Sequence, residues 1–294
     1  MSPAAAGGPR GMTNTLEAPG ATLTYDIRDA ESSEPPLLMI GSPMDARGFA
    51  TLAGHFPDRT VVTYDPRGTE RSVKDDPSSE STPEQHADDL HRIISELGDG
   101  PVDVFASSGG AVNALALVAR HPEQVRTLVA HEPPLAKVLP DRDEAMAAVR
   151  SVADAYQRDG FGPGMARFIA LTSIPGPIPA GWADQDGPDP AMFGLPGEDD
   201  GRRDDALLSQ NIISCTHYEP DFDALHSAST RIVVAVGAES EGQMAYRGGL
   251  GVAGRLGAVP VVFPSNHGGF LGGEFGATGD PDGFAAALRE ALAE

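Results

Sequence analysis

Cysteine is almost absent from this sequence. Its 294 residues include one cysteine, Cys215, so no disulfide can form within the chain. Such sparse use of cysteine is typical of a reducing compartment, and we expect a cytoplasmic protein. Long apolar runs are missing too, since none approaches the roughly 20 residues that a membrane-spanning helix needs. Residues 1–11 lack the apolar core of a signal peptide, and we expect them to form a flexible tail.

Positive charge is scarce as well. The chain carries 21 Lys and Arg residues against 43 Asp and Glu residues, which gives a formal net charge of −22. A surface this acidic repels nucleic acids and anionic membranes, so we expect neither as a partner. The partner that we expect is a small-molecule substrate, and the sequence leaves self-association into a homodimer open.

The order of the predicted elements indicates an α/β fold. Apolar runs typical of buried strands alternate with helical patterns through residues 12–134, and the alternation resumes at residues 230–294. Such alternation implies right-handed crossovers and a mainly parallel sheet. Residues 135–229 contain helix-like segments and no convincing strand. The chain is long enough for one large domain with an inserted helical subdomain.

A strand, a tight turn and a helix meet at Ser108. The apolar, β-branched run that begins at residue 102 ends at this serine, and helical spacing of apolar residues starts directly after it. Ala106 and Gly110 lie two residues before and two residues after it, and a sharp turn requires such small neighbours because larger side chains would collide. The pattern predicts a nucleophile elbow that exposes the hydroxyl at the start of a helix. A Gly-rich loop with an idle serine is the alternative.

Together with this turn, three further stretches resemble the α/β-hydrolase superfamily. They are residues 37–43 (LLMIGSP), residues 63–68 (TYDPRG) and residues 265–269 (SNHGG). They occur in the family's order and span about residues 35–270, nearly the whole chain. The resemblance implies the α/β-hydrolase fold, with a mostly parallel sheet of roughly eight strands. It also implies that residues 135–229 form a helical cap over the nucleophile.

The resemblance further implies a base and an oxyanion hole. A serine hydroxyl needs a base to take its proton, and imidazole suits that task near neutral pH. His267 lies in a Gly-rich turn after the last predicted strand, where the family places its base. The implied donors to the oxyanion are the backbone N–H groups of Gly109 and Ser42. Ile40 stands where the family usually has a histidine that ties down the second loop, so this chain must anchor that loop differently.

The acid departs from the usual pattern. The superfamily generally supplies it in a Gly-x-x-Asp turn, but residues 237–241 have Ser240 at that place. Some haloalkane dehalogenases carry the acid at the end of the strand after the elbow helix, where this chain has Glu132. We predict Glu132 as the acid, because it directly follows a buried strand and the two prolines behind it stiffen the chain. Glu239, one residue before the usual place, is the alternative.

These residues predict a serine hydrolase of the carboxylesterase or lactonase kind that needs no cofactor. It would cleave a small-molecule ester or lactone through an acyl-enzyme on Ser108, with His267 as general base. Serine at the elbow argues against dehalogenase and epoxide hydrolase chemistry, which uses aspartate there in this superfamily. An acyltransferase or perhydrolase with the same residues is the nearest alternative, and a non-catalytic small-molecule-binding protein is another. No metal is expected, because the acidic residues at 184–200 show no ligand spacing.

Overall fold

A nine-stranded sheet forms the centre of the computed structural model, which describes residues 11–293. The strand order is β1-β2-β4-β3-β6-β7-β8-β9, and β5 pairs with β2 outside this path. The strands are β1 Gly11–Ala18, β2 Ala21–Arg28, β3 Leu37–Ile40, β4 Val61–Asp65, β5 Val73–Lys74, β6 Val102–Ser107, β7 Val125–His131, β8 Arg231–Gly237 and β9 Val261–Phe263. From β4 to β9 along this order all pairings are parallel, whereas β1, β2 and β5 pair antiparallel. The α/β class and the mostly parallel sheet are confirmed.

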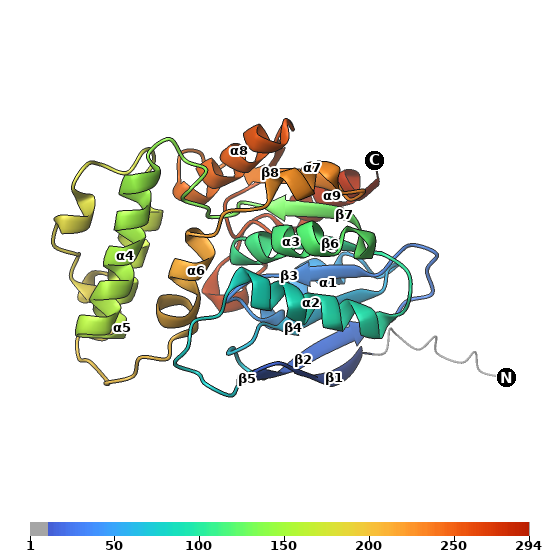
Figure 1. Ribbon diagram of the computed structural model, residues 1–294, viewed down its shortest axis with the longest axis horizontal. Coiled ribbons are helices and arrows are strands. Elements are labelled where there is room, and N and C mark those ends of the chain that lie inside the picture. Colours follow the sequence, from blue (N-terminus) through green and yellow to red (C-terminus); the bar gives the residue numbers. More distant parts are fainter. Residues whose placement is uncertain (1–10, 294) are drawn as a thin grey trace.

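Helices cover both faces of the sheet (Figure 1). One face packs against helices α2, α3, α7 and α8, and the other packs against α1 and α9. Their bounds are α1 Ala50–Gly54, α2 Pro83–Leu97, α3 Gly109–Arg120, α7 Phe222–Ser227, α8 Met244–Leu256 and α9 Pro281–Ala293. Side chains of β6 alternate between the two layers, with Val104 in the first and Phe105 in the second. A strand buried on both faces explains why this part of the sequence is continuously apolar.

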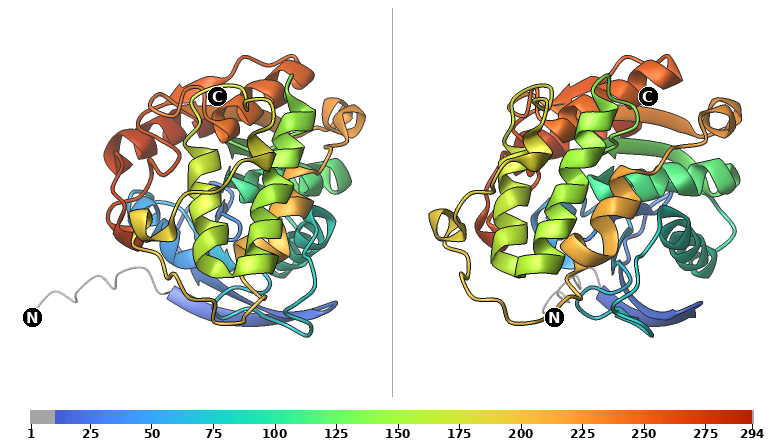
Figure 2. Two further views of the ribbon diagram at one scale, coloured as in Figure 1. Left: turned by 90° about the vertical axis from the view of Figure 1, so that its left-hand side faces the viewer. Right: turned by 60° about the vertical axis from the view of Figure 1, so that its left-hand side comes forward.

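The remaining helices lie beyond the carboxyl ends of the parallel strands (Figures 1 and 2). They are α4 Arg142–Asp159, α5 Phe161–Thr172 and α6 Ile212–Thr216, with a π-helix at Ala206–Asn211. Short 3-10 turns form at Trp182–Asp184 and Pro190–Phe193. Apolar side chains of α4 and α5 form a hydrophobic cluster of their own with Leu208 and Ile212. We call residues 135–221 the helical segment.

The observed elements change two expected boundaries. Phe222 and Leu225 of α7 pack in the same cluster as α3 and α8, so this helix belongs to the layer on the sheet, although it falls within residues 135–229. Gly11 begins β1 and is not part of a tail, and the other ten residues of the expected tail lie outside the described residues. Within residues 11–293, no helix has the length and apolar character that crossing a membrane requires.

Candidate active site

Ser108 occupies the turn between β6 and α3 with backbone angles that only a sharp turn imposes. Its φ is 59° and its ψ is −126°, a left-handed conformation that costs a residue with a side chain of order 1–3 kcal/mol. The N–H of Ser108 donates to the carbonyl of His131 at the end of β7, at 2.9 Å. Ser108 is half-buried, while Ser107 before it and Gly109 after it are buried. The turn therefore presents the second of the two serines, as the elbow pattern predicts.

The loop after β3 packs directly on the first turn of α3. A Cβ atom on Gly110 would lie 2.7 Å from the Cα of Gly41 and from the carbonyl oxygen of Ile40. One on Gly109 would lie 2.4 Å from the carbonyl oxygen of Ser42. Both contacts are too short for any side chain, so the two glycines are required for the loop to approach the elbow.

Two buried backbone donors lie at this contact. Gly109 opens α3, so its N–H has no acceptor within the helix. Ser42 is only 8% exposed, and in the described part of the chain neither of these N–H groups donates a hydrogen bond to another protein group. Buried donors without a partner are uncommon in folded proteins. Here they lie beside the half-buried Ser108, where a negatively charged oxygen could accept from both.

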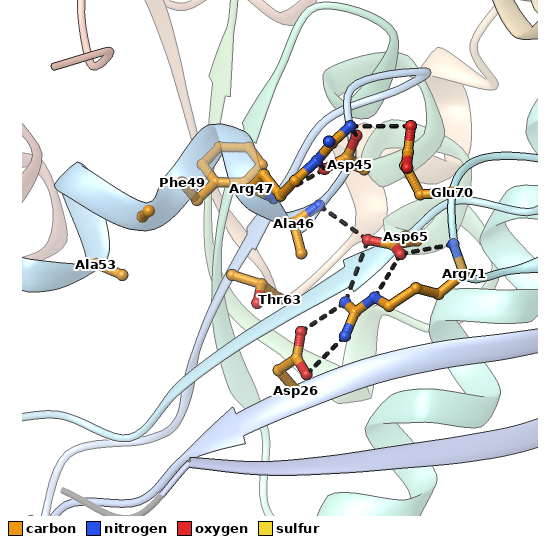
Figure 3. A pocket seen from close by; sticks show the side chains of 11 residues that line it. Asp26, Asp45, Ala46, Arg47, Phe49, Ala53, Thr63, Asp65, Glu70 and Arg71 are labelled. Atoms are coloured by element: carbon orange, nitrogen blue, oxygen red, sulfur yellow. Dashed lines mark hydrogen bonds and ion pairs between the residues drawn. The ribbon is translucent and has the colours of Figure 1, made fainter. Parts of the chain in front are cut away.

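Asp65 anchors this loop in place of the missing histidine (Figure 3). Its Oδ1 accepts the backbone N–H of Ala46 at 3.1 Å, and its Oδ2 accepts from the backbone N–H and Nε of Arg71. Ile40, at the position of that histidine, is buried in the core. The anchoring residues line a cavity of about 500 Å³ beside the loop, and its carboxylates are paired with Arg47 and Arg71. We therefore assign the residues around this cavity a structural role, which is to hold the loop in place.

His267 and Glu132 contact each other across the carboxyl edge of the sheet. The Nδ1 atom of His267 lies 2.7 Å from Oε1 of Glu132. The carboxylate side chain is fully buried, whereas 41% of the histidine side chain is exposed. A hydrogen bond on Nδ1 leaves the second ring nitrogen available to a reacting group. The structure thus brings together the two residues that the sequence places 135 positions apart.

The other oxygen of Glu132 has two donors of its own. The backbone N–H of Gly237 lies 2.7 Å from Oε2, and the hydroxyl of Ser240 donates to the same atom. Burial opposes the charged form, but the hydrogen bond and charge of His267, the nearby His131 and the Ser240 hydroxyl outweigh it. Together they lower the pKa of Glu132 to about 2. Glu132 is therefore an ionised carboxylate at neutral pH, although no water reaches its side chain.

The backbone around Glu132 is strained and well supported. Its φ is 47°, and its N–H donates to the carbonyl of Ala235 on β8 at 3.0 Å. The preceding residue, His131, accepts the N–H of Ser108 and places its ring 6.0 Å from that of His267. The end of β7 thus supports both the serine turn and the carboxylate. Strained residues of this kind concentrate at functional sites.

Glu239 lies outside this arrangement. Its side chain is exposed and has no hydrogen-bond partner among the described residues, while its backbone N–H donates to the carbonyl of Ser265 at 2.9 Å. Sequence reasoning identified neither the anchoring by Asp65 nor the contact between Ser240 and Glu132. One feature of the sequence could have indicated the second contact. Ser240 stands at the position where the family usually has its acid, and a hydroxyl at that position can reach a carboxylate supplied by the neighbouring strand.

A family model and a curated protein match this chain in sequence. The family model described as the α/β-hydrolase fold matches residues 37–184. The uncharacterized hydrolase YraK of Bacillus subtilis (strain 168) is 32% identical over 262 residues, which cover 87% of this chain and 89% of YraK. This chain belongs to the α/β-hydrolase family. As a member of that family, the protein is a hydrolytic enzyme.

Solved structures of α/β-hydrolases match nearly the whole chain. A thermophilic esterase from Thermogutta terrifontis has a TM-score of 0.63 at 22% identity, and the match covers 96% of this chain and 98% of the esterase. An enol-lactonase from Burkholderia xenovorans LB400 has a TM-score of 0.59 at 18% identity, covering 96% of this chain and 100% of the lactonase. At these identities the likeness shows the fold, and the chemistry must come from the residues described above.

Proposed function

We propose that this α/β-hydrolase is a serine hydrolase that cleaves a small-molecule ester or lactone through an acyl-enzyme on Ser108. One observation carries the proposal: the 2.7 Å contact between His267 Nδ1 and the buried carboxylate of Glu132, at the sheet edge where Ser108 occupies its strained turn. A histidine oriented in this way by a carboxylate is the base that a serine nucleophile needs.

The proposed reaction has two halves. In the first, His267 Nε2 takes the hydroxyl proton while Ser108 Oγ attacks the acyl carbon, and the N–H groups of Ser42 and Gly109 stabilise the oxyanion. The alkoxide leaves with the proton from Nε2, and the acyl group stays on Ser108. In the second half, a water molecule gives a proton to Nε2 and attacks the acyl carbon. The bond between the acyl carbon and Ser108 Oγ then breaks, Nε2 returns the proton to Oγ, and the acid is released. Glu132 stays ionised throughout and stabilises the imidazolium.

The helical segment is proposed to act as a cap that selects the substrate. It lies beyond the carboxyl ends of the strands, the edge that carries Ser108, Glu132 and His267 (Figure 2). The 41% exposure of the His267 side chain leaves a small acyl compound access to the base. An esterase and an enol-lactonase are among the proteins of the same fold, which agrees with an ester or lactone as substrate. We further propose that the enzyme acts in the cytoplasm on a small molecule.

A fluorophosphonate probe with intact-mass detection tests the nucleophile. The wild-type enzyme should take up one adduct, and Ser108→Ala should take up none and lose ester hydrolysis to near background. Ser107→Ala is the matched control, because Ser107 is the adjacent serine but is buried with its hydroxyl 2.9 Å from Nδ1 of His131. It should still be labelled. Hydrolysis by Ser108→Ala within about tenfold of wild type would overturn the assignment.

The same assay separates the alternatives. A panel of esters of increasing acyl length identifies the preferred substrate of an esterase. Transfer of the acyl group to an added alcohol or to hydrogen peroxide, at the expense of the free acid, would indicate an acyltransferase or a perhydrolase. Binding of an ester without labelling or turnover would indicate a binding protein on a hydrolase scaffold.

A further inference from the structure

A single hydrogen bond to His267 does not define the orientation of the Glu132 carboxylate. The last torsion of a glutamate side chain is broad and roughly two-fold, so the carboxylate plane can rotate around that contact. The base needs an acceptor held to within about 0.5 Å of the productive position. Something other than His267 must therefore fix the second oxygen.

Two donors converge on that second oxygen from the loop after β8. The backbone N–H of Gly237 lies 2.7 Å from Oε2, and the Ser240 hydroxyl donates to the same atom. Ser240 is 1% exposed, so water does not compete for its hydroxyl. Its single proton has one other acceptor, the carbonyl of Gly237 at 3.2 Å. The ionised carboxylate is both closer and the stronger acceptor, so the proton is directed to Glu132.

The loop that carries the two donors is itself fixed. The N–H of Ala238 donates to the carbonyl of Phe263, and the N–H of Glu239 donates to the carbonyl of Ser265, both at 2.9 Å. A Cβ atom on Gly237 would lie 2.8 Å from the Ser240 hydroxyl oxygen and 3.1 Å from Oε2 of Glu132. The loop thus packs closely around the Glu132 carboxylate. Its backbone hydrogen bonds to Phe263 and Ser265 also fix it against the segment that leads to His267.

We propose that Ser240 is a positioning residue, whose hydroxyl fixes Oε2 of Glu132 so that Oε1 faces Nδ1 of His267. The catalytic consequence rests on the proposed function, but the geometric statement does not. Ser240 stands where the family usually has the acid that faces the histidine. In this chain its hydroxyl instead donates to Glu132, the carboxylate that follows the neighbouring strand β7. Its hydroxyl therefore contributes to the activation of Ser108 without touching the substrate.

The test compares wild type with Ser240→Ala and Ser240→Thr, using ester turnover and proton NMR. Loss of the hydroxyl should lower kcat about ten- to hundredfold with KM unchanged, because a misplaced carboxylate affects the transition state and not substrate binding. The low-field resonance of the proton between His267 and Glu132 should shift or broaden in Ser240→Ala. Ser240→Thr keeps the hydroxyl and should restore both readouts toward wild type.

A matched control and a second variant complete the experiment. Ser81→Ala removes a serine hydroxyl that is equally buried but lies outside the helical segment, where it accepts from Nζ of Lys74 at 3.0 Å, and it should leave kcat and the resonance unchanged. If Ser240→Ala does not fold, Ser240→Cys takes its place, since a thiol is a much weaker donor of similar size. Wild-type kcat and an unchanged resonance in a folded variant without the hydroxyl would overturn the proposal. If wild-type enzyme neither hydrolyses esters nor reacts with the probe, the proposed function fails, and the resonance alone decides whether Ser240 positions Glu132.

Discussion

Two fully buried carboxylates lie at opposite ends of neighbouring strands, and their partners differ. Asp103, near the start of β6, is 0% exposed and is bound by Arg59 at 2.8 Å and by Arg126 at 2.6 Å. Glu132, just past the end of β7, is also 0% exposed, and its partners are one imidazole, one backbone N–H and one hydroxyl. Burial is the same at both sites, so the partners must determine what each carboxylate does.

The difference in partners agrees with a structural role for Asp103 and with the catalytic role proposed for Glu132. Guanidinium groups stay charged at every accessible pH, so the two partners of Asp103 cannot release a proton, and their ion pairs with it close the amino end of the sheet. Imidazole changes its charge near neutral pH, and Glu132 has neutral donors on its other oxygen. Only at Glu132 can a proton that arrives on the partner be stabilised and later released. The comparison predicts that substitution of Asp103 lowers the free energy of unfolding, whereas substitution of Glu132 lowers kcat.

The largest expected effect is the loss of turnover in Glu132→Gln. The N–H of Gly237 can only donate, so the new amide must turn its oxygen toward Gly237 and its NH₂ group toward His267. The imidazole must then accept at Nδ1 and carry its proton on Nε2, which is the wrong tautomer for a base. We expect kcat to fall on the order of 10⁴-fold. Steady-state kinetics on a variant shown to be folded by circular dichroism checks this, and activity within tenfold of wild type would contradict it.

Asp103→Asn should lower the stability of the protein and leave its turnover almost unchanged. It leaves the guanidinium of Arg59, 5% exposed, without its carboxylate, and breaking a buried pair costs about 3–5 kcal/mol. Urea unfolding should show that loss, while kcat of the folded variant stays within about twofold of wild type. A stable variant with reduced kcat would mean that the two ends of the sheet are not separate in function.

A smaller effect should appear in the pH dependence of stability. The pKa of Glu132 is about 2 in the folded chain, below its ordinary value of 4.5, so the unfolded chain takes up the proton first. Its contribution to stability is complete above pH 4.5 and is lost as the pH falls toward 2, on the order of 1 kcal/mol per pH unit. In Glu132→Gln this slope should be absent. Urea unfolding of both proteins between pH 5 and pH 3 checks the difference, which should not stay constant across that range.

The sequence supports some parts of this site better than others, for physical reasons. The elbow at Ser108 could be predicted because a strained turn restricts its immediate neighbours, and those neighbours are adjacent in the chain. The contact between Ser240 and Glu132 could not, because it depends on how a loop bends three residues past the end of β8. The packing of α7 was missed for a related reason. Its six residues show which side is apolar, but not that Phe222 and Leu225 meet α3 and α8.

The smallest effect should be that of Glu239→Gln, which separates the two acid locations considered from sequence. Glu239 follows β8 closely enough to reach the histidine loop, but it does so through its backbone, since its N–H donates to the carbonyl of Ser265. That bond turns the side chain to solvent, where a carboxylate and an amide each keep their own hydration. We therefore expect kcat within about twofold of wild type and unchanged probe labelling. If this variant were inactive while Glu132→Gln kept its activity, Glu132 would be a second structural carboxylate like Asp103, and the loop after β8 would have to rearrange to bring Glu239 to His267.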